Sequence, residues 1–304
     1  KPGSPLEATL KLQRVRFSNF LHQPTSLINF KTSGVLNVDS SHFENISTVA
    51  GVITSNFDAI VVDSTSNQAS LYSLGHWQKD EVIQATLKKP TTAENSAFSI
   101  SIQDSIFSEL NTKTLPIRNL GVEPQFFTTN ASLLRLSDFC GTLNIDEVTV
   151  KKLYCDLLMD TPNSNDETRN HIGGGAIVVN GSEMTISITN SDFQHIMSAN
   201  GVIQVRNAST SSSFSMIGTN VNQSHGLTGS ILTLTTTEEM EITIKDGIFK
   251  YNILSSNRLT FPFDKASTFV INQPVSPNQT TLIRNCDIEE NFGIGESIIV
   301  SVNG

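Results

Sequence analysis

The stretch "MTISITNSDFQHIMSANGVIQV", residues 184–205, contains two short apolar segments joined by a bend, and its pattern recurs along the chain. With Phe193 as an anchor, Ile188 and Ile186 stand five and seven residues before it, and small Ser191 stands two before it. Apolar and polar residues alternate within each segment, as in a strand with one buried face. The pattern therefore predicts β-strands rather than helices.

The same frame fits seven further positions, with three departures. Val15 and Val148 take the small position before Phe17 and Val150, and Thr281 replaces the first apolar residue before the last anchor. The anchors are Phe17, Phe43, Phe107, Val150, Phe193, Val221, Phe249 and Ile288. The spacing of consecutive anchors is 26 to 28 residues where it is shortest and 39 to 64 elsewhere.

A second apolar segment follows several anchors after eight or nine residues and begins with a small residue. These segments start at Ser26, Gly51, Gly201, Gly229 and Ser297. Self-similarity at such a period is typical of a solenoid, in which each repeat buries its apolar face on its neighbours. A β-sandwich also has many short strands, but it gives no reason for the constant gap. We therefore expect an all-β parallel β-helix whose anchors stack as an interior ladder.

Two sequence motifs resemble a known family. The steps φ-x-φ-x-x-S-x-F and the run "GGGAIVV" at residues 173–179 resemble right-handed parallel β-helix repeats of the pectin-lyase-like class. Within that class, Gly174-Gly175-Ala176-Ile177 and Phe249-Lys250-Tyr251-Asn252 resemble the GGA-I/L/V and F-x-x-N motifs of polymorphic outer-membrane proteins. The resemblance implies a single-stranded, right-handed solenoid over nearly the whole chain.

Four segments do not fit the frame, namely residues 55–97, 108–131, 154–174 and 250–266. Insertions in a solenoid project from one face and often carry recognition, so these segments are the expected seats of any specific contact. No linker divides the chain, and we expect one domain over residues 1–304. Both ends are already in frame, which predicts either a longer native chain or copies that stack end to end into a filament.

Charge and composition limit the partners. A net charge of −9 disfavours nucleic acid, because affinity for phosphates rests on Lys and Arg. It also disfavours anionic membranes, and no apolar run reaches the length that spans a bilayer. We therefore expect no nucleic-acid partner and no membrane span, and we expect self-association and possible contacts with glycans.

Six Asn-x-Ser/Thr sequons predict N-glycosylation, although Asn, Ser and Thr are abundant enough to give that number by chance. The frame places all of them in turns or loops, where a glycan can leave the surface. They are Asn45, Asn130, Asn180, Asn207, Asn222 and Asn278.

Three cysteines are too few for a disulfide scaffold. Cys286 occupies the inward small position, which predicts a buried thiol. Cys140 and Cys155 flank one repeat; they are either bonded, which would stabilise the fold by ~3 kcal/mol and indicate an oxidising compartment, or two free core thiols.

Charged residues before several anchors give the one hint of catalysis. The frame turns Asp104, Asp146, Glu147, Lys245 and Asp246 outward, and enzymes of this class that cleave acidic polysaccharides cluster carboxylates on an outer sheet. Asn190 and Gly218 interrupt that column, so we interpret it as a solvated face.

The remaining candidates are equally unspecific. The loop at residues 160–168 offers oxygen ligands without calcium-site spacing, the six histidines lack metal-ligand spacing, and Trp77 lies in an insertion. We predict no catalytic, cofactor or metal site. The expected function is an extracellular or cell-surface structural glycoprotein, part of a fibre, surface layer or adhesin. The alternatives are a polysaccharide-active lyase or hydrolase and a non-catalytic carbohydrate-binding β-helix.

Overall fold

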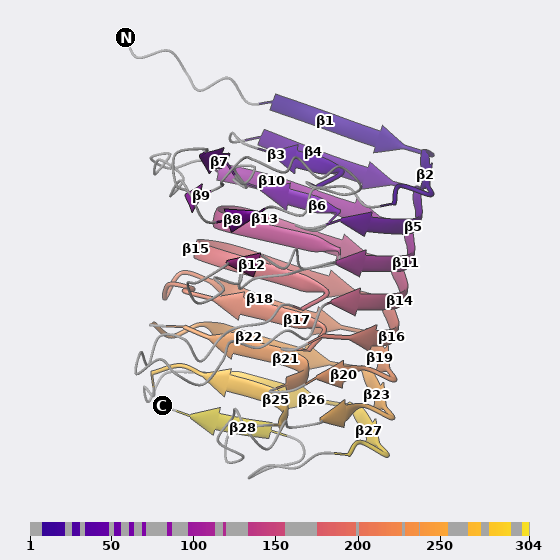
Figure 1. The fold of residues 1–304 in the computed structure, drawn as a ribbon. Coiled ribbons are helices and arrows are strands. Elements are labelled where there is room, and N and C mark those ends of the chain that lie inside the picture. Colours follow the sequence, from indigo (N-terminus) through magenta and orange to yellow (C-terminus); the bar gives the residue numbers. More distant parts are fainter. Residues whose placement is uncertain are drawn as a thin grey trace.

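The computed structural model is an all-β stack of short parallel strands (Figure 1). Those of its residues that can be described contain no helix. They are residues 8–21, 26–30, 34–48, 52–55, 61–63, 69–70, 84–86, 97–112, 118–119, 133–155, 175–198, 201–226, 229–236, 238–254, 267–274, 280–292 and 300–303.

Most strands belong to a 14-stranded sheet and a 10-stranded sheet, both parallel throughout. The 14-stranded sheet holds two columns, which the long strands β13 and β15 join because each takes part in both. The 10-stranded sheet forms the column between them in chain order. Within the described residues these columns build eight levels, which we call rungs.

The first column contains the opening strand of each rung. It comprises β1 (Ala8–Gln13), β4 (Gly34–Asp39), β10 (Ala97–Gln103), the later part of β13 (Leu134–Asp146) and of β15 (Ile177–Thr189), β18 (Ser213–Ile217), β22 (Glu241–Lys245) and β26 (Thr281–Arg284).

The second column is the 10-stranded sheet. It comprises β2 (Arg16–Ser18), β5 (His42–Thr48), β11 (Ile106–Thr112), β14 (Thr149–Cys155), β16 (Asp192–Met197), β19 (Asn220–Asn222), β20 (His225–Gly226), β23 (Ile248–Lys250), β24 (Ile253–Leu254) and β27 (Asp287–Glu289).

The third column closes each rung. It comprises β3 (Ile28–Phe30), β6 (Ile53–Ser55), the early parts of β13 and β15, β17 (Ile203–Arg206), β21 (Gly229–Thr235), β25 (Ser267–Asn272) and β28 (Val300–Asn303). Two small antiparallel pairs lie outside the columns, β7 (Val61–Asp63) with β9 (Gln84–Thr86) and β8 (Ala69–Ser70) with β12 (Arg118–Asn119).

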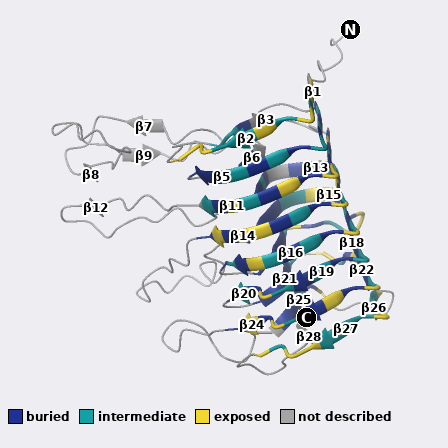
Figure 2. Ribbon diagram, turned by 90° about the vertical axis from the view of Figure 1, so that its right-hand side faces the viewer, coloured by how far each residue is buried: buried dark blue, intermediate teal, exposed yellow. Residues whose placement is uncertain are grey.

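The frame inferred from the sequence coincides with the strand register. Each anchor pairs with the next one along the second column, from Phe17 with Phe43 to Phe249 with Ile288. The rings of Phe17, Phe43 and Phe107 stack at centroid distances of 5.0 and 4.7 Å. The six inner anchors are fully buried, whereas Phe17 and Ile288 on the outermost rungs are partly buried. Figure 2 shows this alternation of buried and exposed positions along the strands.

Each rung turns sharply between its first two strands, at what we call the first corner. One residue there has a positive φ, as at Asp104 and Asn190, and its backbone N–H donates to a carbonyl of the next rung. Where the next residue is Ser41, Ser105 or Ser191, its hydroxyl bonds to the backbone. Ser105 Oγ accepts from the Ser41 N–H at 3.1 Å and donates to the Gln103 carbonyl, so the side chain satisfies backbone groups that the bend leaves buried.

The architecture is all-β with parallel sheets and is compatible with a β-helix-like solenoid. The strands of the third column pair in the order β15-β17-β21-β25-β28. Their outward-facing residues therefore adjoin and form one continuous face. The Gly175-Ala176 step directly precedes β15, and a Cβ at Gly175 would lie 2.9 Å from the Gly201 carbonyl oxygen. The glycine of the motif is therefore required by close backbone approach.

Candidate functional site

Polar and basic side chains gather at outward positions of the third column. We call this set the third-face polar cluster; it comprises Arg135 on β13, Gln204 and Arg206 on β17, and Thr233 and Thr235 on β21. Gln204 pairs in register with Thr233, and Arg206 pairs with Thr235. Arg135 reaches the same row through Val178, which pairs with both Arg135 and Gln204. The cluster thus spans four adjacent rungs.

Burial makes this cluster unusual for an outward sheet face. Gln204 is 1% exposed and Thr233 is 3% exposed. Gln204 Oε1, Thr233 Oγ1 and Thr235 Oγ1 are buried without a hydrogen-bond partner. Since leaving a buried polar atom unpaired costs about 1–3 kcal/mol, these three atoms suit a partner that brings donors and acceptors of its own.

The cluster is also electropositive. Burial, and to a lesser degree the charge of Arg206, lowers the pKa of Arg135 to about 10. Burial also lowers the pKa of Arg206 to about 10. Both guanidinium groups stay charged at neutral pH.

Sequence reasoning missed this cluster. Within each third-column segment the residue between two buried apolar ones faces outward, as Gln204 does in Ile203-Gln204-Val205. Aligning the second apolar segments on Gly201 and Gly229 would set Gln204 opposite Leu232, one residue away from its observed partner Thr233. The charged residues before the anchors, which the frame singles out, lie at the first corner instead.

The predicted carboxylates do lie along the first corner, but hydrogen bonds between rungs use them. Asp146 Oδ1 accepts from Thr189 and Asn190, and Asp246 Oδ1 accepts from Asn285. Asp104 Oδ2 accepts from Ser40 at 3.2 Å. Among the described residues, no group of three His, Cys, Asp or Glu side chains could hold a metal ion. The corner is thus built as a ladder of polar side chains.

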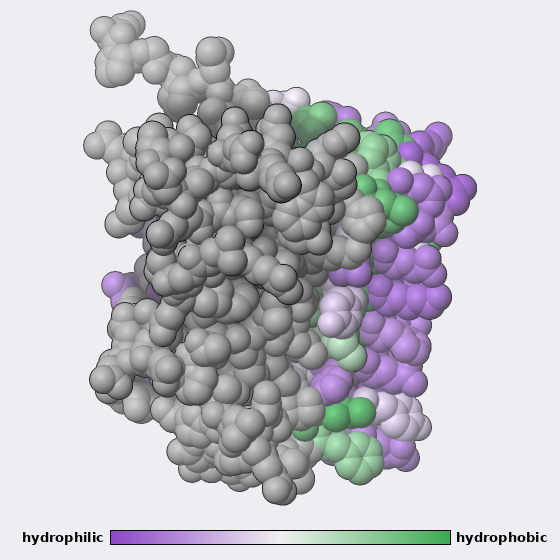
Figure 3. All heavy atoms as spheres, in the orientation of Figure 1, coloured by the Kyte–Doolittle hydropathy of each residue, from purple (hydrophilic) through white to green (hydrophobic). Residues whose placement is uncertain are grey.

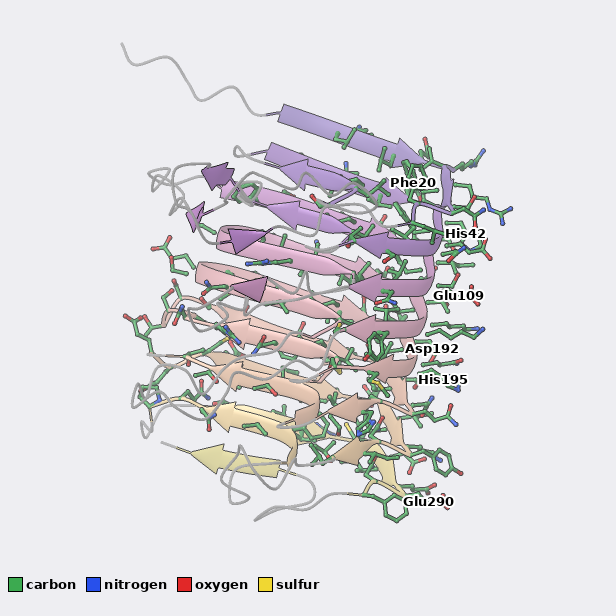
Figure 4. All side chains as sticks on the ribbon, viewed as in Figure 1. Phe20, His42, Glu109, Asp192, His195 and Glu290 are labelled. Atoms are coloured by element: carbon green, nitrogen blue, oxygen red, sulfur yellow. The ribbon has the colours of Figure 1, made fainter. Side chains whose placement is uncertain are left out.

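Exposed charge pairs cover the second column, whose outer edge is largely hydrophilic (Figure 3). Arg16 bonds Glu44 at 2.7 Å, Lys152 bonds Glu109 at 2.9 Å, and Lys250 contacts Asp287 and Glu289. The hydrogen bond from Arg16 lowers the pKa of Glu44. Figure 4 shows His42, Glu109, Asp192, His195 and Glu290 projecting along this edge; Asp192 and His195 share β16, and the other three come from other rungs. The side chains form a solvated face rather than a convergent site.

Four of the six sequons fall within the described residues. Asn207 is exposed and follows β17 with a φ of 56°, whereas Asn45, Asn180 and Asn222 lie inside strands. The expectation that all six occupy turns or loops is therefore wrong for these three, although Asn45 has a φ of 52° because its strand bends there. Asn130 and Asn278 lie outside the described residues.

The disulfide between Cys140 and Cys155 is not formed, because both are free thiols. They belong to different corners of one rung. Cys140 Sγ lies 4.0 Å from Glu183 Oε2, while the buried Cys155 donates to the Gly175 carbonyl at 3.1 Å. The alternative of two free thiols holds. Cys286 is half-buried rather than fully buried, and its Sγ lies 3.3 Å from the Arg284 carbonyl oxygen.

Most of the predicted insertions lie outside the described residues, together with Trp77 and the oxygen-rich loop at residues 160–168. The described part of the chain includes no helix long and apolar enough to cross a membrane. Comparison with known proteins finds no matching family model, no matching curated protein and no matching solved structure.

Proposed function

We propose that this chain is a single-domain, right-handed parallel β-helix of the pectin-lyase-like type that serves as an extracellular structural glycoprotein of a fibre, surface layer or adhesin. The observation that carries the proposal is the uninterrupted parallel register from Phe17 to Ile288. A stack in which each rung contacts only its neighbours makes a long, stiff body. Such a body suits a load-bearing or display role at a cell surface.

Self-association is the expected mode of assembly. Apolar side chains are exposed on the last two rungs, where Tyr251 is 48%, Ile253 44% and Phe292 65% exposed. Ile253 and Phe292 are direct neighbours through a parallel bridge. A second copy that covers these side chains would remove apolar surface from water at about 25 cal/mol per Å².

Two measurements test the structural role. Immunogold labelling of intact cells of the native source should place the chain outside the membrane; labelling only after permeabilisation would contradict the proposal. Light scattering against concentration should show mass growth that Phe292→Asp reduces and that the control Asn220→Asp, on an outward second-column position, does not. A mass that is independent of concentration would contradict the proposed self-association.

The second candidate is a non-catalytic carbohydrate-binding β-helix, and the third-face polar cluster is the observation that favours it. The unpaired oxygens of Gln204 and Thr233 match sugar hydroxyls. A glycan array tests this role. Gln204→Leu should abolish any signal while Lys152→Gln, at an exposed pair, should retain it.

An enzymatic function would be detected by the release of product. Release of unsaturated or reducing sugar from acidic polysaccharides would indicate a lyase or hydrolase instead, and the two variants would then separate that activity from binding. Binding without product release, lost in Gln204→Leu, would favour the non-catalytic role.

A further inference from the structure

Two sequons that lie 27 residues apart in the chain meet in the fold. Asn180 stands in β15 and pairs in register with Arg206, so Asn207 follows directly on the adjacent rung. The side-chain amide of Asn207 donates from Nδ2 to Asn180 Oδ1 at 2.8 Å. The two glycan acceptors are therefore in contact.

The backbone fixes both asparagines at this spacing. The Asn207 N–H donates to the Thr235 carbonyl at 3.0 Å, and its positive φ holds the bend. Gly181, next to Asn180, packs so tightly that a Cβ would lie 1.9 Å from the Phe139 carbonyl oxygen. The backbones that carry the two amides are therefore held on adjacent rungs by the packing between them.

The sequon at Asn207 is also closed in the folded chain. Its hydroxyl residue, Ser209, accepts a hydrogen bond from the Glu183 N–H at 3.0 Å, and the middle residue Ala208 is fully buried. A transferase that reads the Asn-x-Ser hydroxyl needs an open, extended segment. Modification at this position therefore precedes folding, and the folded rungs must then accommodate whatever was attached.

Attachment joins C1 of the first sugar to the amide Nδ2. The sugar comes from an oligosaccharide carried on a lipid pyrophosphate; its C1–O bond breaks, and the amide proton leaves with the lipid pyrophosphate. The modified amide keeps one N–H, so a glycan on Asn207 is compatible with the bond to Asn180 Oδ1. Glycans on both would start from neighbouring strands only ~4.8 Å apart, which is about the thickness of one sugar ring.

We propose that Asn180 and Asn207 are mutually exclusive glycosylation sites and that the folded protein carries its glycan on Asn207. Asn207 is exposed and points out of a bend, whereas Asn180 is half-buried beside the side chains of the third column. A chain modified at both positions cannot close this corner and is lost before secretion. The inference rests on the proposed extracellular glycoprotein role.

The test uses residues 1–304 secreted from a eukaryotic host. In a background with Asn45, Asn130, Asn222 and Asn278 replaced by Gln, intact mass counts the glycans on the remaining pair. The secreted, protease-resistant protein should carry one glycan, with the doubly modified species lost. Asn180→Gln should leave occupancy unchanged, and Asn207→Gln should shift the glycan to Asn180.

A matched control keeps Asn45 and Asn222 as the sole sequons, because the anchors of their rungs lie 178 positions apart in the chain, at Phe43 and Val221. These two should be modified independently. Doubly modified Asn180/Asn207 protein at the product of the single occupancies would overturn the inference. An unmodified pair beside an occupied control pair would overturn it while leaving the glycoprotein proposal standing, and no glycan at any sequon would overturn both.

Discussion

One inward column of the second sheet changes its chemistry along the stack. Three residues after the anchor, Ile46, Leu110, Leu153 and Ile196 line up on four consecutive rungs. They are all buried and form an aliphatic column. On the last three rungs the same position holds Ser224, Asn252 and Asn291, which form a hydrogen-bonded amide column.

The backbone at this bend differs between the aliphatic column and the amide column. In the aliphatic part, β5, β11 and β14 each run seven residues through the bend. In the amide part the strand divides, as β23 and β24 do, and side chains replace the missing ladder bonds. Asn252 Nδ2 donates to the Val221 carbonyl, and Asn252 Oδ1 accepts from the Ser224 N–H at 2.9 Å. The position in the strand determines that the side chain points inward. The local backbone determines whether that side chain must also supply hydrogen bonds.

Putting an amide into the aliphatic column should have the largest effect. Leu153→Asn removes packing worth 2–5 kcal/mol and buries an amide for which the aliphatic column offers no side-chain partner, so a loss of roughly 4–6 kcal/mol is expected. Urea unfolding followed by circular dichroism measures it. The control Lys151→Asn, outward on the same strand, should change stability by less than about 0.5 kcal/mol. Equal losses would contradict the register.

The reverse exchange should cost less. Asn252→Leu keeps the branching at Cγ but orphans the Ser224 N–H and the Val221 carbonyl, both within the core, so we expect a loss of about 3 kcal/mol. Asn252→Asp removes only the donated hydrogen bond, because a carboxylate can still accept from Ser224 but cannot donate to Val221. A Leu variant as stable as the parent protein would show that the amide column does not replace backbone bonds.

The sequence predicted the frame because burial of one strand face imposes a strict period of two on the apolar residues. The apolar residues five and seven positions before the anchors show that period. It also held a signal for the amide column, since Phe249-Lys250-Tyr251-Asn252 places Asn252 three residues after an anchor. That signal was interpreted as family resemblance rather than as an inward amide. The third-face polar cluster was not predictable in this way. Its residues come from separate rungs, and outward positions carry no periodic constraint on residue type.

The first corner runs past both columns and allows a finer comparison. Ser105 Oγ makes contacts of 3.1 and 2.6 Å beside the aliphatic column, whereas the two contacts of Thr219 Oγ1 beside the amide column are both 3.4 Å. Ser105→Ala should therefore cost about 1–3 kcal/mol, and Thr219→Val should cost less. Thermal unfolding of both variants, with Ser108→Ala as the outward control, measures the difference. A larger loss for Thr219→Val would reverse this ranking.

The smallest effects are expected from the exposed pairs at the two ends of the stack. The Arg16 hydrogen bond lowers the pKa of Glu44 below its ordinary value of 4.5, and the Lys250 hydrogen bond lowers that of Asp287 below 3.8. A lowered folded-state pKa gives stability that is present above the unfolded pKa and is lost as pH falls through the folded pKa. Both contributions should therefore be complete at neutral pH and disappear only in acid.

The hydrogen bonds of Lys250 to Asp287 and Glu289 raise the pKa of Lys250 above 10.5. The stability that Lys250 contributes is therefore present below that value and is lost only as pH rises through the folded pKa. Both acids are partly exposed, with side-chain exposures of 34% for Glu44 and 45% for Asp287, and water and salt screen such pairs. Melting temperature between pH 7 and pH 3 should therefore fall slightly less in Glu44→Gln than in the parent, with the difference confined to pH below about 4.5. The difference should shrink in 1 M salt. A large or salt-independent difference would mean that Glu44 has a role inside the stack, which its position on the outer face of β5 contradicts.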